Sequence, residues 1–292
     1  MSEQAHFSVI IPTRDRPRLL PQCVASALAA TCDGDEVIVI DDGSQIPPAS
    51  LLRQFEGSRL RIISGEGKGA AHARNIGIKR SHGDIVMFLD DDDEMLPGYR
   101  NHVSALVKDV VPRPLFGYSS VYKAGDADRA SAQLPEGYFH NNYPFTSLLN
   151  AFSMGFWAHR TVFENLGLID ETLVTNEDTE FLLRLLASDY IGWYSGVPGV
   201  RVGRADAKAD LASLTHRTPA ATRAEAFSAI LATHSELIGT LDGGQRYFRQ
   251  RIVKYLARAG RLQDALTTAE RRPGDMMLAI GEFVSGRVRS RR

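Results

Sequence analysis

Cysteine is scarce in this 292-residue chain, which contains only Cys23 and Cys32. They are nine residues apart and belong to no CxxC or paired-histidine pattern, so neither a disulfide framework nor a zinc site is indicated. No apolar run approaches the roughly 20 residues that a membrane-spanning helix needs, and polar residues stand where a signal peptide would have its apolar segment. We expect a cytoplasmic protein, either soluble or peripherally bound at the inner face of the membrane.

Several other signatures are also absent. The eight histidines show no metal-ligand spacing, and the glycine-rich turn at residues 65–69 lacks the third glycine of a dinucleotide fingerprint, which argues against a dehydrogenase. We expect no nucleic-acid partner. The formal net charge of −1 conceals an asymmetry: residues 221–292 hold 13 Lys+Arg and 7 Asp+Glu, so the C-terminal part is basic and the rest acidic.

Strand-length apolar runs alternate with helical patterns in the first part of the chain. Predicted strands cover residues 7–11, 37–40, 60–63 and 85–89. Such alternation is typical of a mostly parallel sheet covered by helices on both faces, which places the chain in the α/β class. From about Pro219 the pattern becomes helical, with one long helix expected over residues 221–240. We therefore predict an α/β domain over residues 1–218 and a helical extension over residues 219–292.

Acidic residues directly follow the strand at residues 85–89, as Asp90-Asp91-Asp92-Asp93-Glu94. Because side chains alternate along an extended chain, Asp90 and Asp92 point to one side and can share a ligand. Closely spaced carboxylates repel one another, and a hard divalent cation such as Mg²⁺ or Mn²⁺ relieves that repulsion. A solvated acidic loop before a helix at Pro97 is the other interpretation. This stretch alone does not decide between them.

Two further strand ends carry polar residues, at residues 13–15 and 41–44. Parallel strands end at one edge of the sheet, so both groups should lie near residues 90–92, where ligands bind in open α/β sheets. Taken singly, residues 41–44 are more typical of a turn and residues 176–178 of a helix cap. Polar groups at three neighbouring strand ends favour a ligand-binding site at this edge.

Five short motifs occur in the order and spacing of family 2 glycosyltransferases, which the chain resembles over roughly residues 6–205. They are Ser8-Val9-Ile10-Ile11-Pro12-Thr13, Val37-Ile38-Val39-Ile40-Asp41-Asp42-Gly43-Ser44, Ala71-His72-Ala73-Arg74-Asn75-Ile76-Gly77, Phe88-Leu89-Asp90-Asp91-Asp92-Asp93 and Asn176-Glu177-Asp178. The resemblance implies a GT-A fold, a nucleotide-diphosphate sugar donor of the UDP or dTDP type, a divalent metal and inversion at the anomeric carbon.

The resemblance also implies roles for individual residues. Nucleotide binding would involve Pro12, Thr13, Arg14, Asp15, Asp41, Asp42, Arg74, Asp90 and Asp91. Asp41 would read the base, Asp90 would touch the ribose, and Asp92 together with Asp90 would hold Mg²⁺ or Mn²⁺. Asp178 would be the catalytic base, with Glu177 helping to position it. Independently, the N-terminus of the predicted helix after Asn176 favours the anionic form that a base needs.

The chain departs from the family pattern in places. Arg14 and Asp15 replace the usual aromatic residue and asparagine, which leaves the choice of base open. The late histidine that many members place near the metal is missing from residues 201–211, unless His216 takes its place. Residues 124–150 are expected to shape the acceptor pocket.

The sequence thus predicts a metal-dependent inverting glycosyltransferase acting on a glycan or lipid-linked acceptor. The alternatives are a sugar-nucleotide nucleotidyltransferase, which would need a glycine-rich loop after the first strand, and a non-catalytic nucleotide-sugar binding module. The basic C-terminus has three interpretations: a packed helical cap, an oligomer surface, or a peripheral contact with an anionic membrane through Val284, Arg287, Val288 and residues 289–292.

Overall fold

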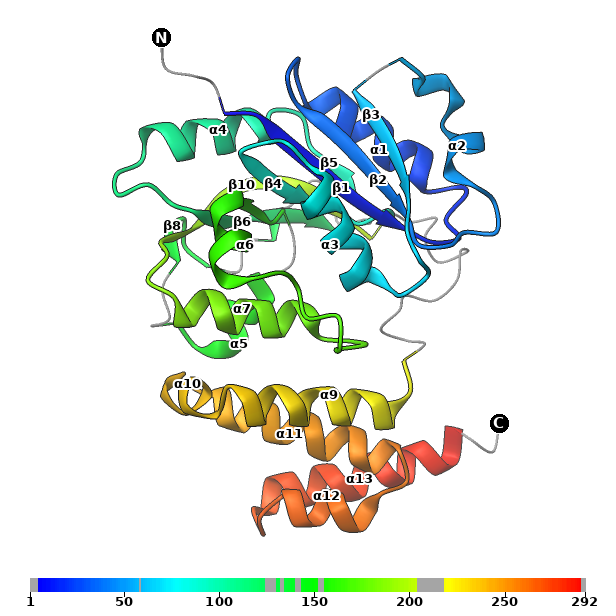
Figure 1. Ribbon diagram of the computed structural model, residues 1–292. Coiled ribbons are helices and arrows are strands. Elements are labelled where there is room, and N and C mark those ends of the chain that lie inside the picture. The colour runs from blue at the N-terminus through cyan, green and yellow to red at the C-terminus, as the bar shows by residue number, and fades with distance from the viewer. Residues whose placement is uncertain are drawn as a thin grey trace. The chain divides into compact units, whose positions relative to one another are not determined.

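The computed structural model describes residues 5–57, 59–123, 130–131, 134–139, 143–151, 155–203 and 218–289 (Figure 1). The chain divides into two compact units. The first consists of Met1–His140, Leu149–Glu171 and Ser188–Leu211, and the second of Asn141–Leu148, Thr172–Ala187 and Ala212–Arg292. The second unit thus combines C-terminal helices with two segments from the middle of the chain. The division into residues 1–218 and 219–292 stays a prediction.

A mixed sheet of ten strands runs through the described part of the first unit. The strands are β1 (Phe7–Thr13), β2 (Glu36–Asp41), β3 (Leu60–Ser64), β4 (Ile85–Phe88), β5 (Glu94–Met95), β6 (Phe116–Lys123), β7 (Ala130–Ser131), β8 (Gly137–Phe139), β9 (Trp157–His159) and β10 (Gly192–Val202). Their order is β3-β2-β1-β4-β9-β6-β10-β5, with β7 beside β6 and β8 beside β10. The predicted α/β architecture is confirmed.

The first half of the sheet is parallel, as the alternation of strands and helices predicts. In the second half, β9 lies antiparallel between β4 and β6, while β6 and β10 are parallel to each other. Thr13 lies opposite Asp41, and Asp41 lies opposite Ser64. The carboxyl ends of β1, β2 and β3 therefore reach the same edge of the sheet, and the chain leaving β4 continues toward it.

Helices cover this sheet on both faces. They are α1 (Leu20–Ala30), α2 (Pro48–Leu51), the 3₁₀ helix η1 (Arg53–Phe55), α3 (Ala70–Arg80), α4 (Tyr99–Asp109) and α6 (Arg160–Leu166). Helix α3 packs against β1, and at Gly77 there is no space for a Cβ atom next to the Ile10 side chain. A side chain at position 77 would push the helix away from the strand.

A fully buried ion pair between Asp35 and Arg100 lies at the amino-terminal side of the sheet. Arg100 of α4 donates from Nε to Asp35 Oδ2 (2.9 Å) and from Nη2 to Asp35 Oδ1 (3.0 Å). Asp35 also accepts hydrogen bonds from the backbone N–H groups of Phe7 and Cys32. The guanidinium carbon of Arg100 is 4.3 Å from the centre of the Phe7 ring. This pair ties the starts of β1 and β2 to α4.

The second unit is helical in its described part. Its helices are α7 (Glu177–Ala187), α9 (Ala220–Thr233), α10 (Ser235–Thr240), α11 (Gly244–Arg258), α12 (Leu262–Thr268) and α13 (Pro273–Arg289), together with the start of α5 (Phe145–Ala151). Its core is aromatic: the rings of Phe227 and Tyr255 stack at 5.8 Å, and those of Phe145 and Phe248 lie 5.6 Å apart. The helical C-terminal region is therefore confirmed.

One helix prediction needs correction. Residues 221–240 form two helices rather than one, because His234 has non-helical backbone angles (φ −114°, ψ 26°). The ring Nε2 of His234 lies 3.0 Å from Glu180 Oε1, which links the junction to α7. Among the helices of the described ranges, none combines the length and apolar character needed to cross a bilayer.

Candidate active site

The acidic edge of the first unit is held together through Thr13, the last residue of β1. The Thr13 hydroxyl donates a hydrogen bond to Asp91 Oδ2 (2.7 Å). Its carbonyl oxygen accepts one from the backbone N–H of Asp42 (2.9 Å). Thr13 thus joins the end of β2 to the acidic segment that follows β4. The structure brings together the three groups of residues that the sequence placed at this edge.

The loop after β1 is fastened to the turn after β2. The Asp15 N–H donates to Ser44 Oγ (3.1 Å), and the Gln45 N–H donates to Asp15 Oδ1 (2.8 Å). Asp15 adopts a positive φ of 54°, which is uncommon for a residue with a side chain. The Ser44 N–H donates to Asp41 Oδ1 (2.8 Å). Asp15 and Asp41 therefore each use one carboxylate oxygen to shape these two loops.

Asp42 has a different environment from Asp41. Its side chain is 7% exposed, its Oδ2 accepts a hydrogen bond from the Gly69 N–H (3.0 Å), and Arg14 Nη1 lies 3.8 Å from the same oxygen. Its other oxygen, Oδ1, is buried and receives no hydrogen bond from the described residues. A buried carboxylate oxygen without a donor is costly, so this atom can accept a hydrogen bond from a ligand.

Within the acidic segment, Asp91 is largely enclosed. Burial raises the pKa of Asp91 to about 7, and the neighbouring charges of Asp92 and Asp90 act in the same direction. The hydrogen bond from Thr13 and the charge of Arg16, whose Nε is 3.9 Å from Asp91 Oδ1, lower it in part. Asp91 consequently holds the acidic segment to the end of β1 through Thr13 and Arg16.

Asp90 is the open member of the segment, with a side chain that is 54% exposed. Arg74 of α3 donates from Nη2 to Asp90 Oδ1 (2.8 Å), and its guanidinium carbon lies 5.8 Å from the centre of the Phe88 ring. Asp92 is half-buried. Arg74 therefore stands beside the acids, as the sequence predicts.

Within the described ranges, the acidic edge offers carboxylates, but no preformed cluster, for a metal ion. In the part of the chain that the structure describes, no three His, Cys, Asp or Glu side chains converge to hold an ion. Mg²⁺ and Mn²⁺ are commonly bound by one or two carboxylates, with substrate phosphates completing the coordination. Asp90 and Asp92 offer hard oxygen donors of that kind. The residues fit such an ion, and its binding stays a prediction.

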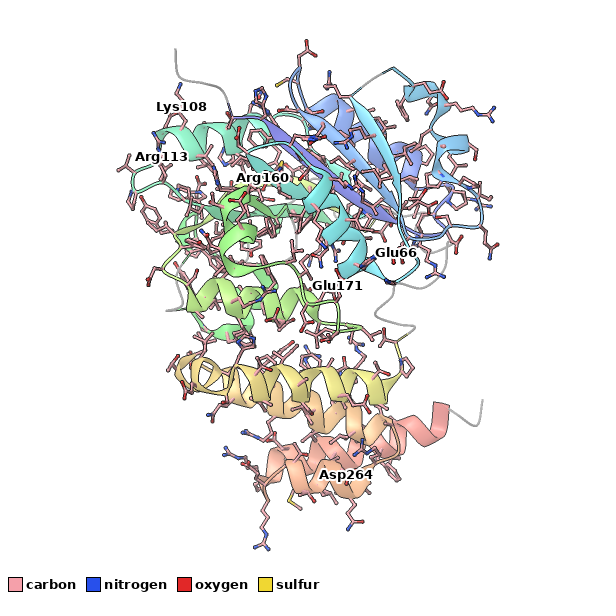
Figure 2. All side chains as sticks on the ribbon, viewed as in Figure 1. Glu66, Lys108, Arg113, Arg160, Glu171 and Asp264 are labelled. Atoms are coloured by element: carbon pink, nitrogen blue, oxygen red, sulfur yellow. The ribbon has the colours of Figure 1, made fainter. Side chains whose placement is uncertain are left out.

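Asn75, in the motif of α3, anchors a distant loop. Its Nδ2 donates to the Ile169 carbonyl (2.8 Å) and to Glu171 Oε1 (2.7 Å), and its Oδ1 accepts from the Ile169 N–H (3.0 Å). His72 Nδ1 lies 2.7 Å from Glu171 Oε2, and His72 Nε2 lies 3.9 Å from Glu66. Glu66 and Glu171 appear together at the start of α3 in Figure 2. The contacts with His72 and Asn75 fix Glu171, after which the chain passes into the second unit at Thr172.

Asp178 and Glu177, the predicted base and its neighbour, lie in the first turn of α7 in the second unit. Asp178 is exposed, and its Oδ1 accepts from the Thr179 N–H (2.6 Å). Within that unit Asp178 lies close enough to Tyr247 of α11 to affect it. Burial raises the pKa of Tyr247, Arg251 lowers it, and the charge of Asp178 raises it. The catalytic roles of Asp178 and Glu177 stay predictions.

The structure adds two residues to which the sequence assigned no role, Arg16 and Gly69. Arg16 could have been noticed as a cation in a loop facing an acidic edge, whereas the backbone N–H of Gly69 leaves no signal in the sequence. Three predictions fall partly or wholly outside the described residues: His216, parts of the 124–150 segment (residues 124–129, 132–133 and 140–142), and the side chains from residue 286 to the C-terminus.

The sequence of this chain is similar to those of known glycosyltransferases. Residues 8–167, more than half of the chain, match the profile described as Glycosyl transferase family 2. An uncharacterized glycosyltransferase of Rickettsia bellii is 30% identical over 171 residues, which cover 58% of this chain and 24% of the relative. The chain thus spans about a quarter of that relative's length. The Escherichia coli protein UDP-Glc:alpha-D-GlcNAc-diphosphoundecaprenol beta-1,3-glucosyltransferase WfgD is 33% identical over 87 residues, or 30% of this chain and 34% of the relative.

Solved structures agree on the fold. Residues 1–349 of Staphylococcus aureus TarS, crystallised with UDP-GlcNAc, superpose with a TM-score of 0.64 at 15% identity, covering 96% of this chain and 81% of that one. The predicted GT-A fold with a helical C-terminal region is confirmed. The chain belongs to glycosyl transferase family 2.

Proposed function

We propose that this chain is a glycosyltransferase that moves a sugar, with inversion, from a nucleotide-diphosphate donor to an acceptor hydroxyl. The observation that carries the proposal is the edge built from Thr13, Asp42 and Asp91, at the ends of β1, β2 and β4. Ligands of open α/β sheets bind at such an edge. Membership of glycosyl transferase family 2 supports the same reaction.

The donor base binds at Asp41 and Asp42 in this proposal. The unused, buried Oδ1 of Asp42 supplies the acceptor that the ring N–H of uracil or thymine requires. The E. coli relative, whose name includes UDP-Glc, and the TarS structure with UDP-GlcNAc support a uridine donor. The Pro12–Asp15 loop, fastened by Ser44, lies against the nucleoside.

Asp92 and Asp90 would hold Mg²⁺ or Mn²⁺ next to the donor diphosphate. When bound, the ion would neutralise the charge that develops on the leaving nucleoside diphosphate. Arg74, bonded to Asp90, holds that carboxylate in place and adds positive charge beside the phosphates. No general acid is needed, because a nucleoside diphosphate leaves without a proton.

Asp178 takes the proton from the acceptor hydroxyl in this proposal, with Glu177 beside it. Both side chains lie in the first turn of α7, next to the positive end of the helix macrodipole. The acceptor is a glycan or a lipid-linked oligosaccharide, and the E. coli relative, whose name specifies a diphosphoundecaprenol-linked sugar, supports that class. We also propose a cytoplasmic location, with or without peripheral contact to the inner face of the membrane.

A thermal-shift panel of UDP, GDP, dTDP and CMP, each with and without Mn²⁺, tests donor class and metal use together. We expect UDP or dTDP to raise the Tm only when Mn²⁺ is present, because the ion would link the diphosphate to Asp90 and Asp92. A ligand at about 100 times its Kd stabilises the folded state by about 2.7 kcal/mol. Equal stabilisation by all four nucleotides, or none by any, would contradict the proposal. Equal stabilisation with and without Mn²⁺ would show that donor binding does not require the metal.

Replacing Asp42 with asparagine is expected to weaken UDP binding about 10- to 100-fold. The change removes the charge from an acceptor whose hydrogen bond is worth about 1.5–3 kcal/mol. Isothermal titration calorimetry with UDP and Mn²⁺ measures it. Asp109→Asn, the same change at the exposed end of α4, is the control and should bind UDP like the wild type. Unchanged affinity in Asp42→Asn would exclude this residue from base recognition.

A further inference from the structure

Basic side chains gather on one face of α11 in the second unit. Arg251, Lys254 and Arg258 follow one another at intervals of three and four residues, so they share a side of the helix, one turn after Tyr247. Arg223 of α9 joins them, with its guanidinium carbon 4.5 Å from the centre of the Tyr255 ring. We call these four residues the α11 basic face.

The described ion pairs neutralise Arg258 of this face but not Arg251 or Lys254. Glu282 of α13 binds Arg258 through two contacts, of 2.6 Å and 3.2 Å. Among the described residues, no carboxylate forms an ion pair with Arg251 or Lys254. Burial lowers the pKa of Lys254, and the charges of Arg258, Arg251 and Arg223 lower it further, against the opposing effect of Glu282. Cations held together in this way repel one another unless an anion binds between them.

Aromatic rings hold the cations in place. The guanidinium carbon of Arg251 lies 5.0 Å from the centre of the Tyr247 ring, and Lys254 Nζ lies 5.8 Å from that of Tyr255. Both tyrosines belong to the packed aromatic core of the unit. The packed rings restrain the side chains of Arg251 and Lys254, so less side-chain entropy is lost when an anion binds.

Tyr247 also connects this face to Asp178. The charges of both Arg251 and Asp178 affect the pKa of Tyr247, so the basic face and the proposed catalytic base share the electrostatic environment of this ring. An anionic group bound at Arg251 and Lys254 would place the molecule that carries it next to that carboxylate. The donor-binding residues, in contrast, belong to the first unit.

We propose that Arg251 and Lys254, flanked by Arg223 and Arg258, bind a phosphate or diphosphate group of the acceptor. Phosphoryl oxygens form charge-assisted hydrogen bonds with guanidinium and ammonium groups, and two or more cations are needed to match a diphosphate. The assignment to an acceptor rests on the proposed function, because it uses Asp178 as the base that the acceptor hydroxyl approaches. Headgroups of anionic lipids carry the same phosphoryl groups, and the vesicle experiment below distinguishes them from an acceptor phosphate.

Isothermal titration calorimetry with sodium pyrophosphate, in EDTA, tests the site on the full chain. We expect the double variant Arg251→Gln/Lys254→Gln to bind pyrophosphate at least about tenfold more weakly than the wild type, because it loses the charge-assisted hydrogen bonds of both cations. Arg246→Gln removes an exposed cation from another side of α11 and should bind like the wild type. Pyrophosphate held at the donor site would bind all three proteins equally, and that result, or no binding by the wild type, would overturn the proposal.

Two further measurements separate the alternatives. Co-sedimentation with phosphatidylglycerol vesicles should not differ between the wild type and the double variant, and a loss confined to vesicle binding would assign the face to lipid headgroups instead. Thermal stabilisation by UDP and Mn²⁺ should be the same in both proteins, which shows that the variant is folded and its donor site intact. If UDP fails to stabilise even the wild type while pyrophosphate binding still depends on Arg251 and Lys254, the proposed function fails and the anion site stands.

Discussion

Replacement of Asp178 by asparagine is expected to lower kcat for sugar transfer by about 10²- to 10⁴-fold, the range that a positioned general base contributes. An amide cannot take the proton of the acceptor hydroxyl, so the attacking oxygen stays a poor nucleophile. Because Asp178 is exposed and accepts only local hydrogen bonds within the described structure, the substitution should leave the fold intact. Donor binding, measured as UDP affinity, should not change.

Asp242→Asn is the matched control for this experiment. Asp242 is an exposed carboxylate in the same unit, and the hydrogen bond it makes to the Phe145 N–H uses its backbone carbonyl, which the substitution keeps. Its kcat should equal that of the wild type. Full activity in Asp178→Asn would exclude this residue as the base. A non-catalytic binding module would show no turnover in either the wild type or the variant.

Arg100→Met is expected to lower the free energy of unfolding by about 3–5 kcal/mol, the cost of leaving one member of a buried ion pair without its partner. Asp35 and Arg100 are 4% and 1% exposed, so water cannot replace the lost bonds. Urea denaturation followed by circular dichroism measures the change. Asp33→Asn serves as control, because Asp33 forms its ion pair with Arg59 on the surface and should contribute little.

The loss in free energy of unfolding caused by Arg100→Met should become smaller at acidic pH. Burial raises the pKa of Asp35, but the hydrogen bonds from Arg100, Cys32 and Phe7 outweigh it and leave the pKa below its usual value. Asp35 therefore adds stability above the unfolded-state pKa of about 3.9, and that stability is lost as the pH falls through the lower folded-state pKa. Without Arg100 this contribution is missing at all pH values. A stability difference that stays constant from pH 7 to pH 3 would contradict this account.

The sequence placed the ends of β1, β2 and β4 within two residues, because their apolar runs are followed closely by polar residues. Parallel pairing then places Thr13, Asp42 and Asp91 at one edge. The antiparallel insertion of β9 was not predictable, since strand pairing depends on contacts with β4 and β6 that lie far away in sequence. Local pattern determines where strands end, and tertiary contacts determine their neighbours.

Roles of adjacent carboxylates were equally hard to separate in advance. Asp41 and Asp42 look alike in the sequence, yet one is bonded by the nearby Ser44 N–H and the other by Gly69, 27 residues away. Only the second keeps a buried oxygen without a donor in the described structure. The ion pair between Asp35 and Arg100 joins residues 65 positions apart and carries no local signal.

Gly77 has a consequence for the charge at the acidic edge. Because position 77 lacks a side chain, α3 rests directly on Ile10 of β1, and the guanidinium of Arg74, three residues earlier on the same helix, reaches Asp90. The glycine acts as a spacer of minimal thickness between helix and strand. A methyl group there would lift the arginine away from its carboxylate without altering either residue.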